Sequence, residues 1–178
     1  MKEDLQTSID YAIANDRRAQ KAIYDQYSGR LLSVCRQYLS NIQEAEDVMV
    51  VSFMKIFSNL SSFQNKGSFD AWIRRIAINQ CLSQLRLKHK IVYGIEDFEI
   101  EDNGLADENL YVEDIQTMID RLPISCKTVF NLYAVEGYKH GEIADMLSIS
   151  EGTSKSQLAY ARKLLKQSMH HHSMADYE

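Results

Sequence analysis

Apolar residues recur every three or four positions along most of the chain, the period of an amphipathic α-helix. In the N-terminal half this pattern predicts three helices, at residues 16–38, 43–59 and 69–88. Polar breaks separate them: residues 40–41, the loop 61–66, and the pair Gly67–Ser68, which is suited to capping the next helix. The pattern predicts a helical bundle.

The helical period resumes near Leu110 and continues to about Lys166, with Pro123 well placed in the first turn of a helix. Two apolar stripes, at 143–147 and 158–165, then flank a tight connection at 148–149. Ser150 is placed to cap the second helix of this pair. This arrangement predicts a helix-turn-helix.

The second helix of the pair carries polar side chains away from its apolar stripe: Thr153, Lys155, Ser156, Gln157, Tyr160 and Arg162. Such side chains can bond phosphates and base edges in a major groove. We expect Gln157 to pair with a base and Arg162 to contact a phosphate. An ordinary helical hairpin of a bundle core has the same spacing, so spacing alone leaves both readings open. Ser148 also stands where such turns usually have glycine, and Ser154 where an apolar residue packs inward.

The charges are unevenly distributed. The formal net charge is −5, but residues 91–120 contain ten acidic residues and no lysine or arginine. The rest of the chain has 15 acids against 20 bases. Residues 93–109 also lack a sustained apolar period, which is typical of an extended or disordered tether. Two basic modules joined by an acidic linker suggest nucleic acid as the partner.

Composition excludes several classes of protein. Apolar residues at 45% and a single proline fit an all-α protein. No run is long enough to span a membrane, and the N-terminus lacks a signal-peptide core, so we expect a cytoplasmic chain. Three distant cysteines favour neither a disulfide framework nor a zinc site. We expect no cofactor, metal or catalytic cluster, and we interpret His170–His172 as part of a tail.

The helix at 69–88 combines aromatic and basic residues. Between Lys66 and Lys90 there are six bases and one acid. A basic helix with aromatic rings beside a polar loop suits single-stranded or melted nucleic acid. The alternative is that Phe69 and Trp72 belong to the core, which large aromatics at helical spacing favour.

Two stretches of the chain carry a family resemblance. Residues 45–48, Phe53, Phe57 and 67–79 resemble the sigma-two domain of ECF sigma factors, the small two-domain initiation subunits of bacterial RNA polymerase. Residues 121–123, 129–130, 136–137 and the helix-turn-helix with 150–153 and 155–156 are similar to their sigma-four domain. The resemblance covers about residues 19–166, in the family's order.

The resemblance implies an all-α protein with a sigma-two bundle at 1–90, an acidic flexible linker at 91–112, a sigma-four domain at 113–170 and a tail at 171–178. It implies that the sigma-two domain binds core RNA polymerase and the melted −10 element, with one base turned out into a pocket. The implied −10 contacts lie in the loop 63–68 and the following helix: Asn65, Lys66, Ser68, Arg74, Arg75, Asn79 and Ser83. The implied polymerase contacts are Asp47, Val50, Val51 and Met54. The resemblance assigns recognition of the −35 element to the six polar residues named above, on the second helix of the helix-turn-helix.

Further implications concern partners. The resemblance implies an anti-sigma factor, no membrane insertion, and a monomer when free of partners. Val50 and Val51 stand where the family usually has Gln-Glu, so two valines are expected at the surface of the polymerase interface. Gln157 stands where arginine is common. The alternative function is a conventional helix-turn-helix regulator, usually a dimer on a palindrome.

Overall fold

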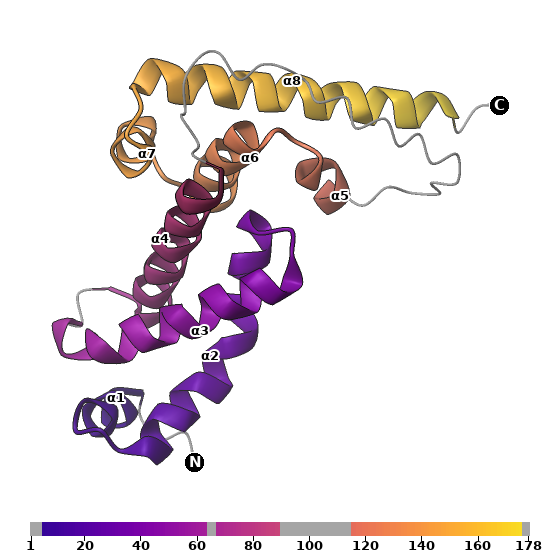
Figure 1. The fold of residues 1–178 in the computed structure, drawn as a ribbon. Helices are drawn as coiled ribbons and strands as arrows, with labels where there is room; N and C mark the ends of the chain where they lie inside the picture. Colours follow the sequence, from indigo (N-terminus) through magenta and orange to yellow (C-terminus); the bar gives the residue numbers. More distant parts are fainter. Residues whose placement is uncertain (1–4, 64–66, 90–114, 176–178) are drawn as a thin grey trace. The chain divides into compact units, whose positions relative to one another are not determined.

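A computed structural model describes residues 5–63, 67–89 and 115–175, with side chains as far as Lys88 and Met169 in the last two ranges. By contacts the chain divides into two compact units, residues 1–90 and 91–178. Every regular element in the described ranges is a helix (Figure 1). The predicted all-α fold of two helical parts is confirmed, while the predicted linker lies outside the described residues.

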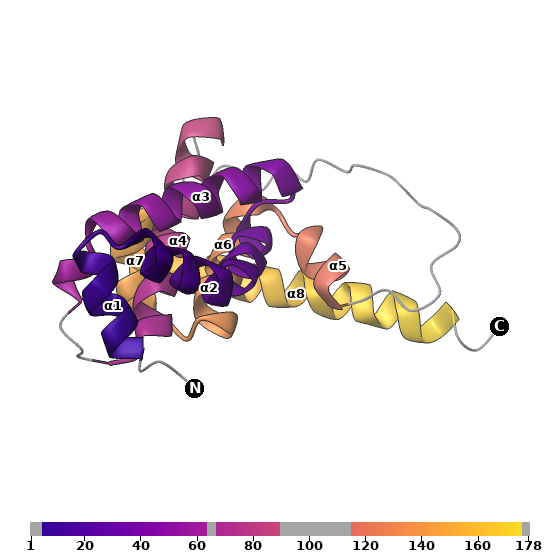
Figure 2. The same cartoon turned by 90° about the horizontal axis from the view of Figure 1, so that it is seen from below.

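In its described residues, unit 1 is a bundle of four α-helices and one short 3₁₀ turn: α1 (Leu5–Ile13), α2 (Arg17–Tyr38), α3 (Ile42–Ser58), η1 (Leu60–Ser62) and α4 (Phe69–His89). Helices α2, α3 and α4 all contact one another, and α1 packs on α2 (Figure 2). The three predicted helices are present within a residue or two of their expected ends. Helix α1 is an addition that the sequence pattern did not reveal.

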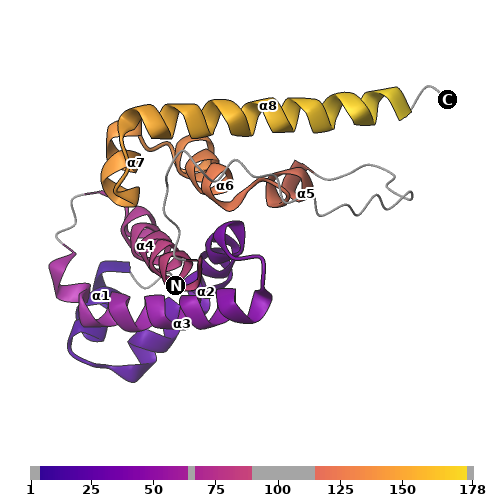
Figure 3. The ribbon, with the colours of Figure 1, turned by 45° about the horizontal axis from the view of Figure 1, so that its top comes forward.

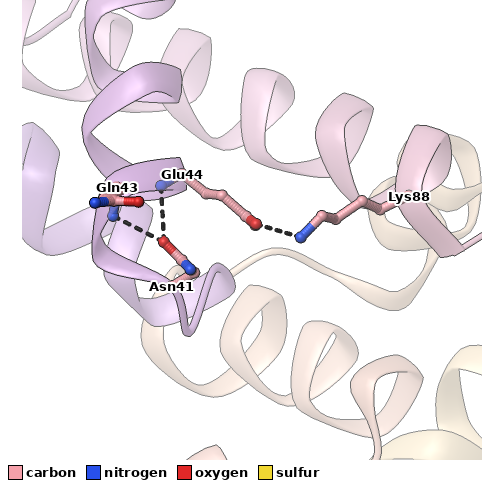
Figure 4. A network of polar contacts seen from close by, with 4 residues as sticks. All are labelled: Asn41, Gln43, Glu44 and Lys88. Carbon is pink, nitrogen blue, oxygen red and sulfur yellow. Dashed lines mark hydrogen bonds and ion pairs between the residues drawn. The ribbon is translucent and has the colours of Figure 1, made fainter.

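Side-chain caps define where α2 and α3 begin. Asp16 accepts hydrogen bonds from the backbone N–H groups of Arg18 (2.7 Å) and Ala19 (3.0 Å). Asn41 does the same for Gln43 (2.9 Å) and Glu44 (3.2 Å) (Figure 4). These caps satisfy amide groups that have no partner within the helix.

An ion pair joins the first turn of α3 to the end of α4. Glu44 contacts the ammonium of Lys88 (Figure 4). Because Lys88 is 46% exposed, solvent screens the pair, and we expect it to contribute no more than about 1 kcal/mol. The apolar core beneath it carries most of the stability of unit 1, through Ile23, Leu31, Ile56, Ile73, Leu82 and Leu85, each at most 2% exposed.

Unit 2, residues 91–178, contains α5 (Ile115–Asp120), α6 (Ile124–Phe130), the π-helical turn η2 (Asn131–Val135), α7 (His140–Leu147) and α8 (Glu151–Ala175). Helices α6 and α7 both pack on α8 (Figure 3). Pro123 is the residue before α6, one position earlier than predicted. The core of unit 2 contains Leu122, Cys126 and Ala161, and Phe130, Leu164 and Leu165 pack against these residues.

The connection between α7 and α8 is tight, as the helix-turn-helix pattern predicts. Ser148 ends α7 in the left-handed conformation, with φ 57° and ψ 44°. The hydroxyl of Ser150 accepts a hydrogen bond from the backbone N–H of Thr153 at 2.9 Å, so the predicted cap is confirmed. Helix α8 continues to Ala175, beyond the expected start of the tail, since residues 166–175 contain no glycine or proline to stop it.

Candidate nucleic-acid interface

Unit 1 has an open hollow between α3, η1 and α4. Its volume is about 310 Å³, and it is lined by Lys55, Asn59, Ser62, Trp72, Ile76, Asn79 and Gln80. Three of these side chains carry amides, one a hydroxyl and one an ammonium, while Trp72 and Ile76 provide apolar surface. The hollow can therefore accept a flat, partly apolar group with a polar edge.

An aromatic cluster supports the wall of the hollow. The ring centroid of Phe69 lies 5.8 Å from that of Trp72 and 5.2 Å from that of Phe63. Phe69 is only 4% exposed and also meets Tyr27 edge-on at 5.4 Å, so the interpretation of Phe69 as a core residue is confirmed. Trp72 is half-buried, with Phe63 at 5.5 Å, and reaches the hollow. Packing against the core therefore fixes the Trp72 ring at the edge of the hollow.

The predicted −10 residues of α4 do not all lie together. Asn79 is exposed and lines the hollow, and Arg75, four residues earlier, lies on the same side of the helix. Arg74 is half-buried and lies five residues before Asn79, which turns it to another side. The hydroxyl of Ser83 donates to the backbone oxygen of Asn79 at 2.8 Å. Ser68 is exposed at the start of α4.

Asn65 and Lys66 are the two predicted −10 residues that lie outside the described part of the chain. Six of the seven lining residues were not among the predicted −10 contacts: Lys55, Asn59, Ser62, Trp72, Ile76 and Gln80. The helical spacing of Trp72, Ile76, Asn79 and Gln80 could have indicated the α4 wall. Nothing in the sequence placed the α3 residues against it.

In unit 2 the prediction that Gln157 reads a base is wrong. Its side chain is 3% exposed, and its Oε1 accepts a hydrogen bond from the thiol of Cys126 at 2.8 Å. It lies on the inner face of α8 beside Leu158 and Ala161. A buried thiol provides the partner that lets an amide occupy this core position.

The other predicted residues of α8 differ in accessibility. Lys155, Ser156 and Arg162 are exposed, as a DNA-facing role requires. Tyr160 is half-buried and packs against the core cluster of Leu122, Cys126 and Ala161. Thr153 is also half-buried, and its Oγ1 lies 2.9 Å from the hydroxyl of Ser150. Tyr160 and Thr153 therefore lie beside the more exposed residues, and their contacts with DNA stay a prediction.

The outward face of α8 includes three residues that the sequence-based prediction did not name. Gly152, Ala159 and Lys163 are exposed and share a face with Lys155 and Ser156, at spacings of three and four residues. We refer to these five residues as the outer face of α8. It combines two cations, one hydroxyl and two small residues, which is compatible with close approach to a DNA groove.

The four predicted polymerase contacts lie on one side of α3. Val50, Val51 and Met54 are 47%, 43% and 66% exposed, and Asp47 is exposed one turn before them. The expectation of two surface valines is confirmed. These four residues form what we refer to as the α3 apolar face.

Two features are absent from the described residues of both units: a cluster of metal ligands and a membrane-spanning helix. No group of three His, Cys, Asp or Glu side chains that could hold a metal ion occurs among the described residues. No helix in the described ranges is both long and apolar enough to cross a bilayer.

Comparisons with known proteins agree for both units. The family model for sigma-70 region 2 matches residues 23–91, and the model for sigma-70 region 4 matches residues 112–165. The chain is 28% identical to the ECF RNA polymerase sigma factor SigW of Bacillus subtilis (strain 168), over 86% of this chain and 90% of that protein.

Two solved structures have a similar fold. One is the sigma factor RpoE in complex with the anti-sigma factor NepR from Bartonella quintana, with a TM-score of 0.53, 21% identity, and coverage of 83% of this chain and 94% of that one. The other is CnrH in complex with the cytosolic domain of CnrY, with a TM-score of 0.50, 18% identity, and coverage of 93% and 97%.

The two models match in the order that the sequence predicted, one on each unit, and between them they account for most of the chain. A conventional helix-turn-helix regulator would not contain the sigma-70 region 2 bundle. The chain belongs to the ECF sigma factors of bacterial RNA polymerase, and it is a transcription initiation factor.

Proposed function

We propose that this sigma factor binds core RNA polymerase through the α3 apolar face, captures an unstacked base of the −10 element in the hollow of unit 1, and reads the −35 duplex with the outer face of α8. The observation that carries the proposal is the hollow itself, with Trp72 and Asn79 on its wall.

The chemistry of the hollow suits a nucleobase. Its volume of about 310 Å³ lies at the lower end of small-molecule sites, which run from about 300 to 1,000 Å³. Stacking on an aromatic ring contributes about 1–3 kcal/mol per base. The amides of Asn79 and Gln80 can both donate to and accept from a base edge, and Lys55 can pair with a phosphate. Capture of a flipped base favours the melted over the duplex state.

Holoenzyme on a promoter that it transcribes provides the test. We expect Trp72→Ala and Asn79→Ala to reduce permanganate reactivity of thymines in the melted region, while binding to core polymerase is unchanged. Gln26→Ala is a matched control, because Gln26 is an exposed amide on α2 that does not line the hollow. Wild-type permanganate footprints in both hollow variants would contradict the proposed base capture.

The outer face of α8 suits a major groove. Lys155 and Lys163 can contact phosphates on either side, and the Ser156 hydroxyl can bond a base edge although it already donates to the backbone oxygen of Thr153 at 3.0 Å. The methyl group of Ala159 can pack against the methyl of a thymine. Arg162 lies beside this face and suits a phosphate.

The α3 apolar face suits a protein partner. Three exposed apolar side chains lie together beside one acid, and desolvation of such a surface favours association with a protein partner. Core RNA polymerase is the partner that the family membership favours. An anti-sigma factor is a second partner by analogy with the two complexes of similar fold, and we propose that it competes for these surfaces. No step of this function requires catalysis by the chain or a cofactor.

A further inference from the structure

Four residues of unit 2 form a continuous series of contacts from the core to the surface. The hydroxyl of Ser154 lies 2.9 Å from Nδ1 of His140. The His140 ring stacks on Tyr133, with centroids 4.6 Å apart and planes at 24°. The guanidinium carbon of Arg162 lies over the Tyr133 ring, 5.6 Å from its centroid. The series begins at a side chain with 0% exposure and ends at an exposed cation.

The first contact explains why a serine occupies a core position. Ser154 lies on the inner face of α8, where the helix-turn-helix pattern calls for an apolar side chain. A buried hydroxyl is costly unless it has a hydrogen-bond partner, and His140 at the start of α7 provides one. The same bond restricts rotation of the imidazole, because one ring nitrogen is held.

The second and third contacts carry that restriction outward. Tyr133 lies in η2, before the helix-turn-helix, and is half-buried. Stacking against a fixed imidazole holds its ring in place. A guanidinium prefers the face of an aromatic ring, so the Tyr133 ring in turn limits the positions that Arg162 can adopt.

We propose that Tyr133, backed by His140 and Ser154, is a positioning residue that holds the Arg162 guanidinium beside the outer face of α8 for a DNA phosphate. The proposal rests on the proposed reading of duplex DNA by α8. A long side chain that is ordered before binding loses less conformational freedom when it binds. Tyr133 therefore contributes to affinity without touching the DNA.

A double-mutant cycle tests this coupling. The full-length chain would be titrated against a fluorescein-labelled duplex that the wild-type chain selects from a random-sequence pool, at several KCl concentrations. The variants are Tyr133→Leu, Tyr133→Phe, Arg162→Ala, and Tyr133→Leu combined with Arg162→Ala. Thermal unfolding of each variant checks that unit 2 stays folded.

We expect Tyr133→Leu to weaken binding about two- to fivefold, the range of an exposed cation–π contact, and Tyr133→Phe to keep wild-type affinity because the ring remains. Arg162→Ala should weaken binding at least as much and flatten the log–log salt slope by about 0.9. In the Arg162→Ala background, Tyr133→Leu should have no further effect.

Two results would overturn the inference: additive losses in the double variant, which indicate a merely structural role for Tyr133, or a loss with Tyr133→Phe equal to that with Tyr133→Leu, which would make the hydroxyl the active group. If the wild-type chain shows no salt-dependent binding to any duplex, the proposed reading by α8 fails and the inference fails with it. If the wild-type chain binds the duplex but the losses from the two substitutions are additive, the inference about Tyr133 fails while the proposed reading of DNA by α8 stands.

Discussion

Two serines at the α7–α8 connection have opposite effects on its stability. Ser148 adopts the left-handed conformation, φ 57°, which costs a side-chain-bearing residue about 1–2 kcal/mol and glycine very little. Ser150, two residues later, accepts the capping hydrogen bond from Thr153 at 2.9 Å. The turn is therefore strained at one serine and stabilised at the other.

We expect Ser148→Gly to raise the free energy of unfolding of unit 2 by about 1 kcal/mol, because it removes the left-handed strain. Ser150→Ala should lower it by about 1 kcal/mol through loss of the cap. Urea unfolding followed by circular dichroism compares these neighbouring changes. A destabilised Ser148→Gly variant would contradict the assigned strain.

The buried position of Gln157 changes the expected determinants of base preference. Gln157→Ala removes the acceptor of the Cys126 hydrogen bond and leaves a cavity, so we expect a loss of about 1–3 kcal/mol in stability and no change in the preferred site. Ala159→Gln, on the outer face, should instead change the preferred base at one or two positions. Binding-site selection with both variants tests whether position 157 or position 159 determines base preference. An altered preference with Gln157→Ala and an unchanged one with Ala159→Gln would assign this role to Gln157.

Burial also governs the thiols. Cys35, Cys81 and Cys126 are each at most 1% exposed. The hydrogen bond between Cys35 and Cys81 lowers the pKa of Cys35 and raises that of Cys81, and burial raises the pKa of Cys126 above its ordinary value of 9.0. A raised pKa means that the neutral thiol is favoured in the folded state. The stabilisation from Cys126 is therefore complete below pH 9.0 and is lost as the pH rises through its folded pKa.

We expect the free energy of unfolding to fall less between about pH 8 and pH 10 in Cys126→Ala than in the wild-type chain, because one alkaline-sensitive thiol is absent. Urea unfolding at both pH values measures the difference. An equal or steeper fall in the variant would show that Cys126 titrates as in the unfolded chain.

At the scale of elements, the sequence predicted the long helices well and the short ones poorly. Helices α2 and α3 begin at the side-chain caps Asp16 and Asn41 and carry long apolar stripes, so their limits could be predicted closely. Helix α1 has nine residues and buries only Ile9 and Ala12, too few for the period to be recognised. The hollow was not predictable in full, because it joins residues of α3, η1 and α4 that only tertiary packing brings together.

The α3 apolar face makes a prediction at this scale. Val51→Gln combined with Met54→Gln should weaken binding to core RNA polymerase about tenfold or more, since both side chains are exposed apolar contacts of the proposed interface. Ile42→Gln is a matched control: Ile42 is 46% exposed on the same helix but nine residues from Val51, on the opposite side. An equal loss of affinity in the Ile42→Gln control and the double variant would show that the α3 apolar face has no special role in binding core polymerase.

At the scale of the whole molecule, each unit carries one part of the proposed function. Unit 1 has the hollow for a base and the α3 apolar face for a partner, whereas unit 2 has the helix-turn-helix. Sequence reasoning predicted the order of a sigma-70 region 2 unit and a sigma-70 region 4 unit, because the order of the motifs and the distribution of charge can be read directly from the sequence. It misjudged Gln157 because polarity alone does not determine which side of a helix a residue occupies.

Run-off transcription shows whether this chain directs initiation by core RNA polymerase. Core RNA polymerase from the same organism would be incubated with genomic fragments, with and without the full-length chain. We expect discrete transcripts that appear only with the chain, that begin at start sites sharing two upstream elements, and that are lost with Trp72→Ala. No chain-dependent transcript from any fragment, with a core enzyme that is active with another sigma factor, would contradict it.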